Sequence, residues 1–267
     1  MLRVGVMQFR IRAGDRAANQ QAVRAWVAEH CGAPTPTAVV LPEIWDVGYV
    51  LDQAETKADP EGRLAAEFLG GLAREYNVWF VGGSVLASSK AGFTNRAQVV
   101  NPKGELVASY DKVHLIPLLN EDKYLVGGNA DCLFDIEGNP AGCVICYDIR
   151  FCEWIRSYAL QGAKVLFISA EWPTVRIDHW RILLQARAVE NMMYIVAANC
   201  CGESNGTDFG GNSLIFDPWG RVLLECGAEE GGGVVEIDPA SVDGIRDHLK
   251  VFSVRVPELY SRVCAKG

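Results

Sequence analysis

The sequence predicts an α/β protein built from two internally similar halves. Apolar strand-like runs alternate with amphipathic helix-like runs up to about residue 237, which is typical of this fold class. Several strands are apolar on both faces, as expected when helices cover a sheet. Each half also contains a strand–turn–strand unit with an x-Pro-x-Gly turn, at 101–104 and 217–220. No linker interrupts this pattern, so we expect a single domain over residues 1–267.

In the first half, Asp15 can cap a helix that runs to Cys31, and the segment 60–76 carries a second apolar stripe of helical period. Five segments have the apolar, β-branched character of strands: 3–8, 38–41, 78–85, 94–100 and 105–111.

The second half repeats this order. Its expected helices are 151–161 and 178–191, and its expected strands are 132–136, 141–146, 164–170, 194–199, 212–216, 222–224 and 233–237. Residues 137–140 (Glu-Gly-Asn-Pro) are interpreted as a turn. The glycines at 231–233 precede a strand and are interpreted as a turn, not a phosphate-binding loop. The tail, 240–267, has a weak pattern, and we expect it to cover the core or lie at a subunit interface.

Composition excludes several classes of function. The net charge is −8 and no block of Lys or Arg breaks it, so nucleic acid is not an expected partner. The start of the chain does not resemble a signal peptide, and no apolar run reaches the ~20 residues of a membrane helix. The nine cysteines include a single CxxC motif, and it lies inside a strand-like run. This pattern favours a reducing cytoplasm. No residue set has zinc-ligand spacing, so no metal or cofactor is expected.

Three residues that can do chemistry follow three predicted strands: Glu43, Lys112 and Cys146. Taken singly, they have ordinary interpretations as a helix cap, a surface charge and a small core residue. In α/β folds, however, the carboxyl ends of strands meet where active sites form. The pattern therefore predicts a carboxylate, an ammonium and a thiol in one cleft.

The segments around these residues resemble, in order, the three signature segments of the nitrilase superfamily: Leu41-Pro42-Glu43, 110–115 (Tyr-Asp-Lys-Val-His-Leu) and 146–151 (Cys-Tyr-Asp-Ile-Arg-Phe). Residues 186–191 and the 212–220 hairpin add to the likeness. The resemblance implies a four-layer α-β-β-α sandwich and a homodimer or larger homo-oligomer. It also implies hydrolysis of a carbon–nitrogen bond, with Cys146 as nucleophile, Glu43 as proton-transfer group and Lys112 as oxyanion stabiliser.

Details within the motifs resemble one branch of the superfamily. Cys146 is followed by Tyr-Asp, as in the amidase branches, whereas classical nitrilases tend to have Cys-Trp-Glu. Residues 120–124 and 171–180 resemble bacterial omega-amidases, which hydrolyse the side-chain amide of 2-oxoglutaramate. This resemblance implies that Glu121 is a second catalytic glutamate, while Glu171 stands where some relatives have Asn or Gln. Two alternatives stay open: hydrolysis of an N-carbamoyl compound or nitrile, and a non-catalytic binding protein.

The substrate of such an enzyme is a small amide, and its oxyanion would face Lys112 and the backbone N–H of Tyr147. A substrate carboxylate needs a cation, for which Arg176 and Lys123 are candidates. Arg150 is expected to pair internally with Asp148 or Glu153. The expected apolar walls come from four aromatic residues: Tyr49, Tyr124, Phe151 and Trp172.

Overall fold

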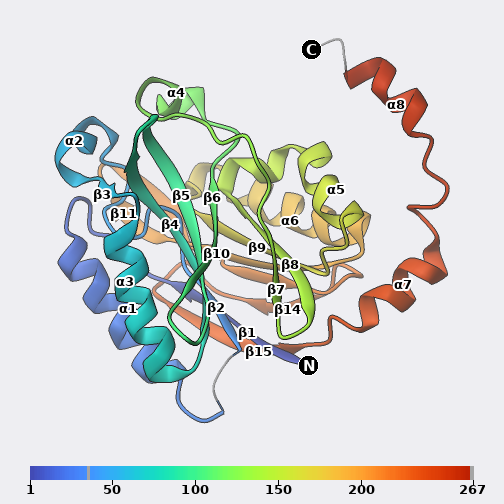
Figure 1. Ribbon diagram of the computed structural model, residues 1–267, viewed down its shortest axis with the longest axis horizontal. Helices are drawn as coiled ribbons and strands as arrows, with labels where there is room; N and C mark the ends of the chain where they lie inside the picture. Colours follow the sequence, from blue (N-terminus) through green and yellow to red (C-terminus); the bar gives the residue numbers. More distant parts are fainter. Residues whose placement is uncertain (35–36, 265–267) are drawn as a thin grey trace.

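Two β-sheets lie face to face, and helices cover their outer sides (Figure 1). The structure, a computed structural model, describes residues 1–34 and 37–264, with the backbone alone for 261–264. The layers follow the order α-β-β-α, which confirms the expected fold class. The largest cluster of buried side chains fills the space between the sheets and continues under the helices of the second half.

The first sheet has three parallel central strands with antiparallel strands on both sides. Its order is β15 (Gly231–Ile237), β1 (Leu2–Gln8), β2 (Ala38–Val40), β4 (Trp79–Ser89), β5 (Gly92–Val100) and β6 (Leu106–Asp111), with β3 (Asp59–Pro60) paired to β4. All three residues of β2 are fully buried, which explains why this strand is apolar on both faces.

The second sheet repeats this arrangement. Its order is β7 (Leu133–Ile136), β8 (Asn139–Ile145), β9 (Val165–Ala170), β10 (Tyr194–Asn199), β13 (Leu214–Phe216) and β14 (Val222–Glu225). Apart from the short β3, each sheet therefore consists of one antiparallel edge strand, three parallel strands and two further antiparallel strands. The turn at 101–104 joins β5 to β6, and the turn at 217–220 joins β13 to β14 at the equivalent position. The predicted similarity of the halves is present in the topology.

Four helices form the outer layers: α1 (Arg16–His30), α3 (Arg63–Tyr76), α5 (Cys152–Leu160) and α6 (Ile177–Asn191). The carboxylate of Asp15 accepts a hydrogen bond from the amide of Ala18 at 3.0 Å, so it caps α1 as predicted. α3 begins three residues later than expected, because Asp59 accepts hydrogen bonds from the amides of Leu64 and Ala65 and so fixes its first turn.

Two predicted turns are placed differently in the structure. The glycines 231–233 belong to β15, where a Cβ on Gly232 would lie 2.2 Å from the carbonyl oxygen of Val6; glycine permits the close pairing with β1. Glu137 and Gly138 make a two-residue turn by themselves, both with positive φ. Asn139 therefore already begins β8.

Several short elements were not predicted. They are η1 (Leu51–Gln53), α2 (Ala54–Lys57), η2 (Pro117–Leu119), α4 (Glu121–Tyr124), η3 (Cys146–Arg150), η4 (Thr174–Arg176) and the pair β11 (Cys201–Ser204) and β12 (Thr207–Gly210). The tail forms α7 (Ser241–Leu249) and α8 (Pro257–Cys264), and α8 stands away from the body of the molecule (Figure 1). Within the described residues, no helix is long and apolar enough to cross a bilayer.

Candidate active site

The two sheets bring three strand ends together. Glu43 follows β2, Lys112 follows β6, and Cys146 follows β8, so two come from the first sheet and one from the second. The amide of Glu43 donates to the carbonyl of Ala170 at the end of β9, which ties the first sheet to the second. The amide of Glu171 donates to Oε2 of Glu43 at 2.9 Å. The site is therefore held from both sheets.

A ring of hydrogen bonds joins four side chains. Nζ of Lys112 lies 2.8 Å from Oε1 of Glu43 and 2.8 Å from Oε1 of Glu121, and all three of these side chains are fully buried. The hydroxyl of Tyr49 closes the ring, 2.8 Å from the Glu43 oxygen and 2.5 Å from the Glu121 oxygen. Asn95 also donates to Oε1 of Glu43, which holds this carboxylate in place.

The electrostatics of this ring favour a charged lysine. Burial alone would lower the pKa of Lys112, but the charges of Glu43 and Glu121 raise it above its ordinary value. The ammonium is thus retained although its side chain is fully buried. The remaining oxygen of Glu121 accepts a hydrogen bond from the amide of Ile116 at 2.7 Å, so this carboxylate is held facing the lysine.

Cys146 lies at a strained point of the backbone, where β8 passes directly into η3. Its φ is +45°, a value that non-glycine residues rarely adopt. Burial raises the pKa of its thiol well above the ordinary value, and the charge of Glu43 adds to this while Lys112 opposes it. At rest the sulfur is therefore a protonated thiol close to the carboxylate of Glu43.

Asp148 fixes the turn that carries the thiol. Its buried carboxylate accepts hydrogen bonds from the amide of Ile145 at 2.9 Å and from the amide of His114 at 3.1 Å. It also bonds the His114 ring at 2.7 Å and the Tyr110 hydroxyl at 2.8 Å. These bonds hold the segment after β6 against the residues next to Cys146. They give His114 a structural role.

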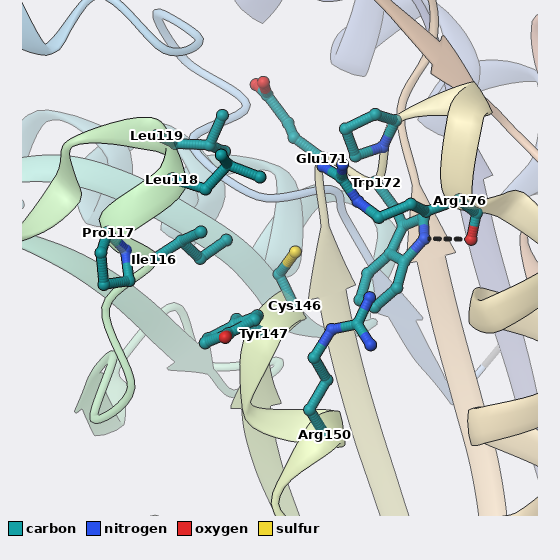
Figure 2. A pocket seen from close by; sticks show the side chains of 11 residues that line it. Ile116, Pro117, Leu118, Leu119, Cys146, Tyr147, Arg150, Glu171, Trp172 and Arg176 are labelled. Atoms are coloured by element: carbon teal, nitrogen blue, oxygen red, sulfur yellow. Dashed lines mark hydrogen bonds between the residues drawn. The ribbon is translucent and has the colours of Figure 1, made fainter.

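A pocket of about 280 Å³ opens above the sulfur of Cys146. Figure 2 shows the sulfur near the centre, with the aliphatic side chains of residues 116–119 on one side and Trp172 on the other. Tyr147 and Pro173 complete the apolar part of the lining. The pocket has room for a small molecule, and its mostly apolar lining carries a few polar groups that can orient a ligand.

Two arginines enter this pocket, and only one of them was predicted. Arg176 lines it, as expected, whereas Lys123 is exposed on α4 and does not. Arg150 also lines it: its guanidinium lies 4.8 Å from the ring of Trp172 and 5.8 Å from that of Tyr147. The expectation that Arg150 pairs with an acidic neighbour is wrong. Within the described residues neither arginine has a carboxylate partner.

The four aromatic residues expected to form the apolar walls do not all line the pocket over the thiol. Trp172 lines the pocket over the thiol, as expected. Tyr124 and the ring of Tyr49 line an adjacent hollow of about 210 Å³, and the hydroxyl of Tyr49 belongs to the ring of polar groups. Phe151 lines neither space, because its ring stacks on His114 with centroids 3.6 Å apart.

Glu171 is a buried acid, and the sequence does not indicate its environment. It is 1% exposed and lies in the pocket wall, and both of its carboxyl oxygens lack a hydrogen-bond partner among the described residues. Its carboxyl group points away from Cys146 (Figure 2). Burial raises its pKa well above the ordinary value, and the charge of Glu43 adds to this while Lys112 opposes it. The buried site therefore favours the protonated, neutral form of Glu171.

A four-layer α-β-β-α fold that buries a thiol, a carboxylate and an ammonium beside a small pocket defines the class of the nitrilase-type hydrolases. The model of the carbon–nitrogen hydrolase family matches residues 3–247. The chain therefore belongs to the carbon–nitrogen hydrolase family, and it is an enzyme of that kind.

Individual relatives extend the comparison. The chain is 39% identical over 257 residues to a 2-oxoglutaramate amidase of Bacillus subtilis, covering 96% of this chain and 98% of the relative. A carbon–nitrogen hydrolase superfamily protein of Xanthomonas campestris, with an arsenic adduct in its active site, has a TM-score of 0.89 at 25% identity, covering 96% and 97%. A mutant amidase of Nesterenkonia, with an acetamide moiety on its active-site cysteine, has a TM-score of 0.86 at 26% identity, covering 98% and 96%.

Proposed function

We propose that the chain hydrolyses the terminal amide of a small dicarboxylate monoamide of the 2-oxoglutaramate type, giving the acid and ammonia. The observation that carries the proposal is the convergence of Cys146, Glu43 and Lys112 below a pocket that two arginines line. The name of the Bacillus relative supports this choice of substrate.

The first half of the reaction forms a thioester. An amide carbonyl is a poor electrophile and a protonated thiol is a poor nucleophile, so Glu43 takes the thiol proton as the sulfur of Cys146 attacks. Negative charge develops on the carbonyl oxygen, and the ammonium of Lys112 with the amide of Tyr147 stabilises it. Glu43 then gives its proton to the amide nitrogen, the carbon–nitrogen bond breaks, and ammonia leaves.

The second half regenerates the thiol. Glu43 takes a proton from a water molecule, whose oxygen attacks the thioester carbon. The carbon–sulfur bond breaks, and the proton held by Glu43 returns to the sulfur of Cys146. Over both halves, one water is consumed and one carboxylic acid and one ammonia are released.

Arg150 and Arg176 would bind the carboxylate at the other end of the substrate. A guanidinium makes paired hydrogen bonds to a carboxylate, and these are strong inside a pocket from which water is largely excluded. Arg150 is held in place by the faces of Trp172 and Tyr147, so little side-chain freedom is lost on binding.

The proposal is tested by ammonia release from 2-oxoglutaramate, compared with a neutral amide of equal length, an N-carbamoyl amino acid and a nitrile. We expect the first substrate to give the highest kcat/KM. Cys146→Ser should fold normally and lose nearly all turnover, and mass spectrometry of quenched wild-type enzyme should find the acyl group on Cys146. No turnover of 2-oxoglutaramate, with rapid hydrolysis of the carbamoyl compound or nitrile, would reject the proposed substrate.

We also propose that the chain forms a homodimer. The projecting segment α8 supports this, as do the exposed apolar side chains before and within it, among them Val254 at 72% and Tyr260 at 46%. Light scattering of the full chain should give twice the mass of one chain, and Val254→Asp should reduce it. A single-chain mass at all concentrations would contradict this proposal.

A further inference from the structure

Tyr49 makes more contacts in the site than its one hydroxyl proton can supply. Its oxygen lies 2.8 Å from Oε1 of Glu43 and 2.5 Å from Oε1 of Glu121. An ionised carboxylate only accepts hydrogen bonds, and a phenol donates one. When both carboxylates are ionised, the hydroxyl proton of Tyr49 can bond only one of them. No proton then lies between the Tyr49 oxygen and the oxygen of the other carboxylate.

Lys112 contacts the same two carboxylates, so the shortage of one proton concerns the whole ring. It donates one proton to each of the same two oxygens, at 2.8 Å. Its third proton faces the oxygen of Tyr49, 3.4 Å from Nζ. The four side chains of the ring, Lys112, Glu43, Tyr49 and Glu121, thus make five contacts, of which three are supplied by the ammonium and one by the phenol. One further proton would complete it.

The proposed reaction delivers that proton. When Glu43 takes the proton of the Cys146 thiol, its new O–H can donate to the oxygen of Tyr49, and the hydroxyl of Tyr49 can then donate to Glu121. All five contacts are then satisfied at the moment when the tetrahedral intermediate forms. A proton can also move along this path: Tyr49 receives one from Glu43 as it gives its own to Glu121.

We propose that Tyr49 is a proton relay between Glu43 and Glu121. The proton removed from Cys146 is then shared between two carboxyl groups, and it returns by the same path to the leaving nitrogen. No proton is gained or lost by the site, and Tyr49 is a positioning residue because it acts through Glu43. This inference rests on the proposed role of Cys146. Burial and the charges of Glu121 and Glu43 raise the pKa of Tyr49 well above its ordinary value, so the phenol transfers protons only by exchange.

The relay is tested without any assumption about the substrate, by the alkylation of Cys146 with iodoacetamide. In this reaction the sulfur–carbon bond forms, iodide leaves and the thiol proton passes to Glu43. The rate at Cys146 is followed by peptide mass spectrometry in mixtures of H₂O and D₂O. The plot of rate against deuterium fraction curves more strongly when two protons move together than when one does. Cys152, an exposed thiol hydrogen-bonded to the carboxylate of Glu153, gives the single-proton reference in the same molecule.

In the wild type, we expect the plot of rate against deuterium fraction to curve more strongly for Cys146 than for the reference, Cys152. Tyr49→Phe should react about 10- to 100-fold more slowly, as for loss of one hydrogen bond to a charged group, and its curve should match the reference. Tyr76→Phe, which removes a hydroxyl at the end of α3 and outside the ring, should behave as the wild type.

Glu121→Gln serves as the second variant, because its side chain still accepts a hydrogen bond but cannot take a proton. Its curve should also match the reference. Strong curvature in either Tyr49→Phe or Glu121→Gln, or reference-like curvature in the wild type, would overturn the relay. If the relay holds while 2-oxoglutaramate is not hydrolysed, only the proposed substrate fails.

Discussion

Replacing Lys112 with Met tests whether the ammonium stabilises the fold as well as the reaction. Met keeps an unbranched apolar stem of similar length and removes the charge. The two carboxylates that share the lysine are fully buried, and each Oε1 lies 2.8 Å from Nζ, so the two oxygens cannot be further apart than twice that distance. In Lys112→Met, Glu43 and Glu121 face each other without a cation.

The size of the effect follows from this separation. Two unit charges about 5 Å apart repel by roughly 3 kcal/mol at an effective dielectric constant of about 20. Removing one partner of a buried ion pair costs about 3–5 kcal/mol in other proteins, which agrees with this figure. For a chain of this size, such a loss lowers the thermal midpoint by roughly 6–12 °C.

The assay is thermal and urea unfolding of Lys112→Met between pH 5.5 and 8. Protonation of one carboxyl group relieves the repulsion, so the folded variant binds a proton that the unfolded chain does not. Its deficit relative to the wild type should therefore shrink as the pH falls. Lys123→Met is the matched control, because it removes the same charge from a lysine that is exposed on α4, and it should change the midpoint little.

The double variant Lys112→Met/Glu121→Gln makes the test sharper. Gln removes one of the two facing charges and keeps the shape of the side chain, so it should restore most of the lost stability without restoring turnover. The reasoning is refuted if Lys112→Met is as stable as the wild type at every pH. It is also refuted if Glu121→Gln does not rescue the variant.

Three further predictions concern the pocket and the turn that carries the thiol. Because burial raises the pKa of Glu171, the folded chain keeps a proton that the unfolded chain has lost, and its stability falls as the pH rises. As the pH rises above the ordinary pKa of a glutamate, Glu171→Gln should therefore gain in free energy of unfolding over the wild type by up to roughly 1.4 kcal/mol per pH unit, measured in urea. A difference that does not change with pH would contradict a raised pKa of Glu171. Arg150→Gln and Arg176→Gln should each raise KM for 2-oxoglutaramate about 10- to 100-fold and leave KM for a neutral amide unchanged. Arg181→Gln, which removes a surface pair, is their control, and equal losses on both substrates would contradict carboxylate binding. Asp148→Asn should lower the free energy of unfolding by about 3 kcal/mol and slow alkylation of the thiol, and unchanged values of both would contradict its role in the turn.

The sequence predicts the strands well because their residues carry a local signal. Apolar runs that end in Glu43, Lys112 and Cys146 mark three strand ends, and an α/β fold brings such ends together. The tail is harder to interpret from the sequence, since α7 buries a single apolar side chain, that of Val242. The pair β11 and β12 was missed for a similar reason, because its residues include Gly, Ser and Asp.

The polar contacts within the site could not be predicted in the same way. Tyr49 and Glu121 are 72 residues apart, and nothing in either segment indicates that their side chains meet. The sequence therefore suggests an apolar wall for Tyr49. It suggests acidic partners for Arg150 because they are close in sequence, whereas in the fold its guanidinium lies over Trp172. Pairings between distant segments depend on how the two sheets pack, which local patterns do not specify.

The charge balance of the site explains why Glu43 must lie close to Cys146. Two carboxylates share one ammonium, so the surroundings of Cys146 already carry excess negative charge when the thiol is protonated. A free thiolate would add a second negative charge in a buried place, and this is why burial and Glu43 raise the pKa of the thiol. The proton must then leave as the sulfur–carbon bond forms, when negative charge moves onto the carbonyl oxygen beside Lys112. A base that takes a proton during bond formation has to lie near the thiol, and Glu43 is close enough for its charge to raise the pKa of Cys146.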